Sequence, residues 1–218
     1  YRLRASSRIS LSGNGKFPWL EDKKYSEQIG AFLLQNRLNT ETVVLSISAQ
    51  EAIVSCVRLP EASREDAEAM LRFEIEKQIP IPLDNVHYGF RMRHVWGSKG
   101  LEAAVAAVDK ATLERYIDLL EKAGLNPSAV CLDIEGHIKY WLDGQSAWDK
   151  AFLFLKVRPR AVDLCLVYKG LLKYFRRAPR EGDGPLLPLL KRELMAAGRL
   201  TEGYRTTGLS FVAVSGLE

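Results

Sequence analysis

Histidines and cysteines are the side chains best suited to nucleophilic or metal chemistry, and their spacing in this chain argues against both. They are His87, His94, His137, Cys56, Cys131 and Cys165. His87 and His94 are seven residues apart on one expected strand and therefore face opposite sides of it. No CxxC pair, HExxH motif or Cys/His cluster occurs, so we expect no catalytic residue, no metal site and no disulfide framework. Scattered cysteines in apolar runs fit a reducing cytoplasm.

Carboxylate pairs and phosphate-binding loops are the other sequence features that could support chemistry. Glu74 and Glu76 stand two residues apart on an expected helix, a spacing that does not place them on one face. We interpret them as part of a solvated or partner-contacting face. Neither GxxxxGK[ST] nor GxGxxG is present, so the sequence has no standard glycine-rich loop to cradle a phosphate.

Basic residues are concentrated in three expected strands after residue 150. They are Lys156, Arg158, Arg160, Lys173, Arg176, Arg177 and Arg180. If those strands pair, several of these side chains form a patch that meets phosphates, anionic lipid headgroups or an acidic partner. The alternative is a sheet edge kept from aggregating by its charge. Both interpretations stay open.

The overall charge pattern bears on nucleic acids and membranes. The chain has 31 Lys and Arg against 27 Asp and Glu, a net charge of +4 on 218 residues, and the two signs are interleaved. It lacks a basic recognition helix and an RNP-type aromatic motif, so we expect no nucleic-acid partner. Since no apolar run reaches the roughly 18 residues of a membrane-spanning helix, we expect membrane association only through partners.

One helix is strongly predicted among the elements that position these residues. Ser63 and Asp66 have the spacing of a capping box. Apolar residues then recur every four positions, at Ala67, Leu71, Ile75 and Ile79. Pro80 ends the helix.

The remaining elements predict a layered α/β chain with mixed sheets (α+β in part). Two β-branched runs, 42–48 and 52–58, predict a hairpin, and 86–96 with 101–108 predict a second strand pair. A three-strand meander is expected at 151–157, 161–168 and 171–177, followed by a helix at 186–197 and a strand at 209–215. Strand runs alternating with helices favour helices packed on mixed sheets. The chain starts without Met, and we expect it to be part of something longer.

A run of motifs resembles a known family. These motifs are Leu59-Pro60, the segment RFEIEKQIPIPLDNV at 72–86, VAAVDK at 105–110, Tyr116 followed by AGLNP at 123–127, and DIEG at 133–136. In this order they resemble the PilM family, the actin-like cytoplasmic proteins of type IV pilus assembly. The cytoplasmic part of GspL, the type II secretion counterpart, shares the broad pattern but usually not the IPxP segment.

The resemblance implies a fold and a domain organisation. The fold is an actin-like, ribonuclease-H-like one with an inserted small αβ subdomain, in a truncated version. Residues 1–59 are expected to begin the first main domain, 60–131 to form the inserted subdomain and 132–150 to return to the first main domain with a linker. Residues 151–218 are expected to form part of a second main domain.

The resemblance also implies a scaffolding function rather than an enzyme. Proteins of this family bind the cytoplasmic tail of a PilN-like inner-membrane protein and contact other platform or motor proteins. By this resemblance the chain is cytoplasmic and peripheral at the bacterial inner membrane. The residues expected to bind the partner are Leu59, Pro60, Phe73, Glu74, Gln78, Ile79 and Pro80.

The nucleotide-binding pattern of actin-like proteins is where the sequence departs from the family. The second Asp-x-Gly turn is expected at Leu155–Pro159, where no DxG occurs, and Leu217 replaces the second glycine of the adenosine turn. We therefore expect no cofactor, which favours a GspL-like scaffold. An actin-like ATP-binding protein or slow ATPase is the alternative, and nucleic-acid binding is a distant third.

Overall fold

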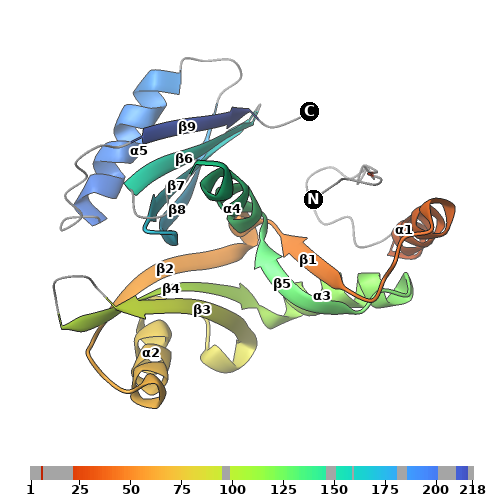
Figure 1. Ribbon diagram of the computed structural model, residues 1–218, viewed down its shortest axis with the longest axis horizontal. Coiled ribbons are helices and arrows are strands. Elements are labelled where there is room, and N and C mark those ends of the chain that lie inside the picture. Colours follow the sequence, from red (N-terminus) through yellow and green to blue (C-terminus); the bar gives the residue numbers. More distant parts are fainter. Residues whose placement is uncertain are drawn as a thin grey trace. The chain divides into compact units, whose positions relative to one another are not determined.

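The computed structural model describes residue 6 and residues 22–94, 99–145, 151–158, 160–180, 186–200 and 210–215. The chain forms two compact units (Figure 1). The first comprises Tyr1–Ile47 and Lys110–Cys131, and the second comprises Ser48–Asp109 and Leu132–Glu218. The four-part domain division expected from the sequence stays a prediction.

The first unit contains two helices and two paired strands. Its elements are α1 (Asp22–Asn36), β1 (Val43–Ile47), α3 (Lys110–Lys122) and β5 (Pro127–Leu132). β1 and β5 form a two-stranded sheet, and the Ser128 hydroxyl donates to the Val43 carbonyl over 3.1 Å. α1 packs along α3. Gly124, at φ +77°, reverses the chain after α3 in a conformation that glycine adopts without strain.

The predicted hairpin of residues 42–48 and 52–58 is wrong. β2 (Ala52–Pro60) does not pair with β1. The intervening residues form the 3₁₀ turn η2 (Ala49–Glu51), in which the Ser48 hydroxyl accepts a hydrogen bond from the Gln50 amide. β2 instead pairs along its whole length with β4 (Gly100–Asp109), whose apolar run is longer than β1. Two successive β-branched runs therefore need not pair with each other when a longer apolar strand follows them in the sequence.

A three-stranded antiparallel sheet covered by one helix forms part of the second unit. Its order is β2-β4-β3, with β3 spanning Val86–His94, which confirms the predicted β3–β4 pair. Helix α2 (Arg64–Gln78) packs on this sheet. Ala67, Leu71 and Ile75 are all fully buried there, so the four-residue spacing correctly predicted the inner face of the helix.

A four-stranded sheet forms the rest of the second unit, in the order β8-β7-β6-β9. Its strands are β6 (Ala151–Arg158), β7 (Ala161–Tyr168), β8 (Leu171–Pro179) and β9 (Ser210–Ser215). The first three form the predicted antiparallel meander, and β9 runs parallel to β6. Lys169 and Gly170, at φ 50° and 74°, make the tight turn between β7 and β8.

Helices lie on both faces of this sheet, as alternation along β6 shows. Leu153 and Leu155 pack with Leu189 and Leu190 of α5 (Leu186–Leu200). Phe154 points to the other face, where the His137 ring of α4 (Asp133–Gln145) lies 6.2 Å from it between centroids. Helices on both faces of a mixed sheet confirm the predicted α/β class.

Candidate partner-binding face and arginine pocket

Helix α2 begins with Ser63 as its N-cap, the half of the predicted capping box in which the serine side chain accepts a backbone amide. The Ser63 hydroxyl accepts a hydrogen bond from the Asp66 amide over 3.1 Å and donates to the Asp66 carboxylate over 2.8 Å. At the other end, the Ile79 amide still bonds the Ile75 carbonyl before Pro80 stops the helix. The predicted start and stop are thus confirmed, and they fix which side chains of α2 face outward.

The seven residues expected to bind a partner divide between the core and the surface. Leu59 and Ile79 are each only 6% exposed and belong to the core between α2 and the three-stranded sheet. The exposed members are Pro60, Phe73, Gln78 and Pro80, and Glu74 is half-buried. The buried pair supports this surface from below, and the other residues are available for contact. Their role in binding stays a prediction.

Phe73 is the centre of the exposed group. Its side chain is 60% exposed. The Lys77 ammonium lies 4.1 Å from its ring centroid and 2.7 Å from a carboxylate oxygen of Glu74. Helical spacing brings the three together, because residues three and four apart share a face. The result is an aromatic ring with a charge of each sign beside it, which we call the α2 outer face: Phe73, Glu74 and Lys77.

A second candidate site arises from the strand register of the four-stranded sheet. Lys156 of β6 and Arg177 of β8 are the cross-strand neighbours of Asp163 on β7. Asp163 is 2% exposed, and Arg177 holds both its oxygens, with 2.8 Å from Nη2 to Oδ2. This hydrogen-bonded carboxylate raises the pKa of the Arg177 guanidinium. Arg158 Nη2 lies 3.3 Å from the same carboxylate.

Asp133, the first residue of α4, adds a second carboxylate to this cluster. Its Oδ2 lies 3.2 Å from both Lys156 Nζ and Arg158 Nη2, and its Oδ1 accepts the Ala49 amide over 2.9 Å. Burial by itself raises the pKa of this carboxyl. The Ala49 hydrogen bond and the charges of Lys156 and Arg158 outweigh burial, so the pKa lies below its ordinary value.

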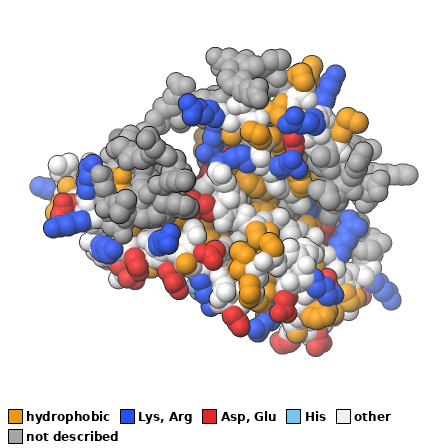
Figure 2. Space-filling model, turned by 180° about the vertical axis from the view of Figure 1, so that it is seen from behind, with side chains coloured by type: hydrophobic (Ala, Val, Ile, Leu, Met, Phe, Trp, Pro, Cys, Tyr) orange, Lys and Arg blue, Asp and Glu red, His pale blue; other side chains and the backbone are white. Residues whose placement is uncertain are grey.

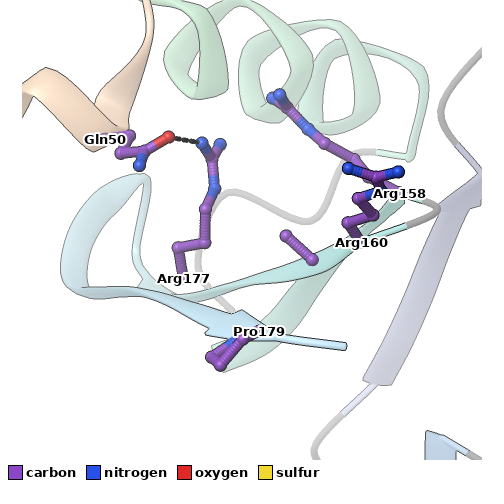
Figure 3. Close-up of a pocket in the computed structure, with 6 residues that line it drawn as sticks. Gln50, Arg158, Arg160, Arg177 and Pro179 are labelled. Carbon is purple, nitrogen blue, oxygen red and sulfur yellow. Dashed lines mark hydrogen bonds between the residues drawn. The ribbon is translucent and has the colours of Figure 1, made fainter. Parts of the chain in front are cut away.

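These charges border a cavity of about 850 Å³ that we call the arginine pocket. It is lined by Gln50, Arg158, Arg160, Ala161, Arg177 and Pro179. Figure 3 shows Arg177 reaching from β8 to Gln50, to whose side-chain oxygen it donates a hydrogen bond. Arg158 and Arg160 extend from the other side of the cavity (Figure 3).

The predicted basic patch is therefore not one evenly solvated surface. Lys173 is buried against Glu102, and Arg176 pairs with Glu193 of α5 over 2.7 Å. Lys156, Arg158 and Arg177 are paired around the arginine pocket as described above. Figure 2 shows Lys and Arg side chains gathered over the part of the second unit that contains the four-stranded sheet, with few Asp or Glu side chains among them.

Sequence reasoning missed Gln50, Asp163 and the site role of Asp133. Gln50 carried no signal, since it lies in a turn far from the meander in sequence. Asp163 did carry one: a single carboxylate inside the apolar run AVDLCLVY predicts a buried charge that needs a partner. Asp133 was noted in the sequence only as the first residue of the DIEG motif at 133–136.

The residues expected in the two nucleotide-binding turns lie at the end of β6 and, in the sequence, just after β9. β6 continues through Arg158 at the position expected for the second phosphate turn, and the expected glycine turn at 216–217 lies outside the described residues. Among the described residues, no group of three or more His, Cys, Asp or Glu side chains is arranged to hold a metal ion. No helix in the described ranges is long and apolar enough to cross a membrane.

Two solved structures with a similar fold are a pilus biogenesis complex and a secretion-system domain. The chain is similar to a PilM–PilN type IV pilus biogenesis complex, at a TM-score of 0.70 and 19% identity over 97% of this chain and 73% of that one. It is also similar to the cytoplasmic domain of EpsL, an inner-membrane component of the Vibrio cholerae type II secretion system. There the TM-score is 0.52 and the identity 15%, over 88% and 71% of the two chains.

A third similar structure is a Bacteroides thetaiotaomicron protein of unknown function with an actin-like ATPase fold. The TM-score is 0.51 and the identity 12%, over 95% of this chain and 71% of that one. No curated protein sequence matches significantly. The expected actin-like fold is thus confirmed.

The sequence profile of type II secretion system protein L matches residues 20–135, which is more than half of the chain. This family is the GspL side of the resemblance noted in the sequence, and the solved structures agree with it. The chain belongs to the type II secretion system protein L family.

Proposed function

We propose that the chain is a non-catalytic scaffold at the cytoplasmic side of a bacterial inner membrane, where it binds the short cytoplasmic tail of a PilN-like membrane protein. The supporting observation is the likeness to a PilM–PilN complex over 97% of the chain. Membership of the protein L family supports a place in a secretion or pilus assembly platform. Contacts with other platform or motor proteins belong to the same proposal.

The α2 outer face is the surface that we assign to this tail. Phe73 supplies a large apolar ring at the surface, the kind of side chain that dominates binding energy at interfaces. Glu74 and Lys77 beside it offer one charge of each sign to an extended peptide. Pro60 and Pro80 border the helix with exposed rigid backbone that loses little entropy on binding.

Binding without nucleotide is part of the proposal. The segment Leu155–Pro159, where the second Asp-x-Gly turn of an actin-like ATP site is expected, has no such sequence and contains Arg158. Arg158 is already paired with Asp133 and Asp163, so these carboxylates are engaged by protein cations. An actin-like ATP-binding protein or slow ATPase is the alternative, and it predicts that ATP changes tail binding.

Fluorescence anisotropy with a labelled N-terminal tail peptide of the PilN-like protein from the same organism tests the proposal. We expect saturable binding that is unchanged by Mg-ATP. Phe73→Ala should weaken it about 10-fold or more, the effect of losing an interface anchor. Tyr140→Ala is the matched control, because Tyr140 is an aromatic residue that is 85% exposed on α4.

Three results of this titration contradict the proposal in different ways. Equal losses for Phe73→Ala and Tyr140→Ala would remove the α2 outer face as the site. Binding that requires Mg-ATP would favour the actin-like ATP-binding alternative. Absence of binding with and without ATP would exclude the PilN-like tail as the partner.

A further inference from the structure

We propose that Cys56 and Lys173 form a reversible covalent bridge when a peroxide oxidises the protein, which gives the second unit a redox-sensitive cross-link. The bridge is independent of tail binding. The distance between the two side chains, their different access to solvent and the charges around them support it.

The strand register brings Cys56 and Lys173 together from two packed strands. Cys56 and Glu102 share the face of the three-stranded sheet that is opposite to α2. Val57 and Leu59, which alternate with Cys56 along β2, pack in the core against α2. β8 packs on β2, and Lys173 Nζ lies 3.8 Å from Cys56 Sγ. Bonding between reacting atoms begins from about 3–3.5 Å, so a small rotation of the cysteine side chain is enough.

The two side chains differ in their access to solvent. Cys56 is half-buried, so a small peroxide reaches its sulfur. The Lys173 side chain is 0% exposed and lies beside that sulfur. A sulfenic acid formed on Cys56 therefore already has an amine in contact with it, whereas a larger external thiol has to approach from solvent. This arrangement favours condensation within the chain over capping by another molecule.

The charges around the sulfur favour its oxidation. The Cys56 thiol donates to Glu102 Oε1 over 3.6 Å. Three cations surround that one carboxylate, namely Lys173, Arg93 and Arg58. The excess of positive charge stabilises a thiolate at this position, and the thiolate is the form that peroxides oxidise.

Lys173 is placed to act as the nucleophile in the second step. Burial lowers its pKa against the opposing influence of Glu102, which increases the fraction of neutral amine. The neutral amine carries the lone pair that attack on sulfur requires. When the ammonium charge is lost, Glu102 stays paired with Arg93 and Arg58, so the bridge leaves no buried carboxylate without a cation.

The bridge forms in two balanced steps. The thiolate attacks one oxygen of hydrogen peroxide, the O–O bond breaks, and the sulfur is oxidised to a sulfenic acid while the peroxide is reduced to water, which takes the thiol proton. The Lys173 ammonium then loses one proton to solvent by way of Glu102, which it contacts. Its nitrogen attacks the sulfur, the S–N bond forms, the S–O bond breaks, and the hydroxide leaves as water with a second proton from the nitrogen. One thiol, one ammonium and one peroxide thus give one sulfenamide, two waters and one proton.

Peptide mass spectrometry of the full chain after treatment with hydrogen peroxide tests the bridge. Free thiols are blocked with iodoacetamide before digestion with trypsin. We expect a cross-linked peptide that joins residues 38–58 to residues 170–176, because a bridged Lys173 is no longer a cleavage site. Its mass should be lower by two hydrogen atoms than the sum of the two peptides, and dithiothreitol should separate them again.

Thermal unfolding of the same samples provides a second readout. The bridge joins residues 117 positions apart, so peroxide should raise the melting temperature by about 5 °C or more. Dithiothreitol should reverse this shift together with the cross-link.

Three variants separate the bridge from general oxidation. Cys56→Ser removes the sulfur and should abolish the cross-link and the thermal shift. Lys173→Arg keeps a cation beside Glu102, but its guanidinium stays protonated and should not condense with a sulfenic acid. Cys131→Ser is the matched control, because Cys131 is also half-buried but belongs to the first unit, and it should leave both readouts unchanged. Circular dichroism verifies that each variant is folded.

The form in which Cys56 is recovered decides the proposal. A cross-link with one additional oxygen also supports it and identifies an N–O–S linkage formed by a second peroxide. Cys56 recovered only as a thiol, a disulfide or a sulfinic acid would overturn the bridge. A cross-link that persists in Lys173→Arg, or a thermal shift that persists in Cys56→Ser, would overturn it as well.

Discussion

Lys173 of β8 and Glu102 of β4 form an ion pair with side chains that are 0% and 2% exposed. The carboxylate also lies 3.2 Å from Arg93 Nη2 and 3.9 Å from Arg58 Nε. Arg93 continues the link, since it donates to the Lys169 carbonyl over 3.4 Å and stacks over the Tyr168 ring at 5.3 Å. Within the second unit, this cluster joins the three-stranded sheet to the β7–β8 hairpin.

Removing Glu102 should destabilise the protein more than removing Lys173. Glu102→Gln leaves a buried ammonium and Arg93 without their carboxylate, which costs about 3–5 kcal/mol of unfolding free energy. Lys173→Met costs less, because Glu102 keeps Arg93 and Arg58 as partners. Burial lowers the pKa of Lys173 against the opposing influence of Glu102, which agrees with a buried ammonium that this carboxylate stabilises. Urea unfolding of both variants measures the difference.

The matched control for this pair is Glu68→Gln. Glu68 forms a surface ion pair with Arg64, whose side chain is 85% exposed, so the same chemical change costs at most about 0.5 kcal/mol. A larger loss for Lys173→Met than for Glu102→Gln would show that the charge on Glu102 is not the centre of the cluster.

Asp133 should make the protein sensitive to acid. The folded state holds the pKa of this carboxyl below its ordinary value of 3.8. A group with a lowered pKa contributes stability at higher pH and loses it as the pH falls below 3.8 toward the folded-state value. Asp133→Asn should therefore lower stability at neutral pH, and the difference from wild type should shrink below pH 3.8.

Thermal unfolding across the acid range measures the effect of Asp133→Asn. Asp84→Asn serves for comparison, because Asp84 is an exposed carboxylate in the turn before β3. A stability difference for Asp133→Asn that stays constant from neutral to strongly acid pH would mean that its ion pairs with Lys156 and Arg158 do not stabilise the fold.

Ser63 should contribute measurably to helix α2 through its cap. Ser63→Ala leaves the Asp66 amide without its hydroxyl acceptor and should cost about 1 kcal/mol. Ser63→Asp retains a capping oxygen but places it near the Asp66 carboxylate, so it should recover only part of the loss. Guanidinium unfolding curves compare the three proteins, and a cost for Ser63→Ala near zero would contradict the role of the cap.

The sequence predicted those parts of the fold that depend on local patterns. The inner face of α2 follows from the spacing of Leu71 and Ile75, and the β7–β8 turn falls in the gap between the predicted strands 161–168 and 171–177. Such features are visible because helix period, capping and turn preference act over a few neighbouring residues. The pairing of β2 was predicted wrongly, since strand choice depends on residues some 50 positions away in β4.

The candidate functional sites could also be predicted from local sequence patterns only in part. The family motifs named Phe73, which is 60% exposed, together with Leu59 and Ile79, which tertiary packing buries. The arginine pocket needs Gln50 beside Arg177, a contact between residues 127 positions apart that no local pattern encodes. Charged side chains gathered by strand register and by a turn from another element become visible only in three dimensions.

Cys165 should be the least reactive of the three thiols. It is fully buried in β7, and burial together with the nearby Asp163 raises its pKa well above the usual range. Because the thiolate is the reacting form, iodoacetamide should modify the half-buried Cys131 in the native protein well before Cys165. Mass spectrometry of peptides after timed labelling measures both rates.

Labelling in denaturant is the control for the two cysteines. There the two labelling rates should converge, because the difference between them comes from folding. Native labelling of Cys165 as fast as that of Cys131 would show that β7 opens readily, and the buried pairing of Asp163 with Arg177 would then need to open with it.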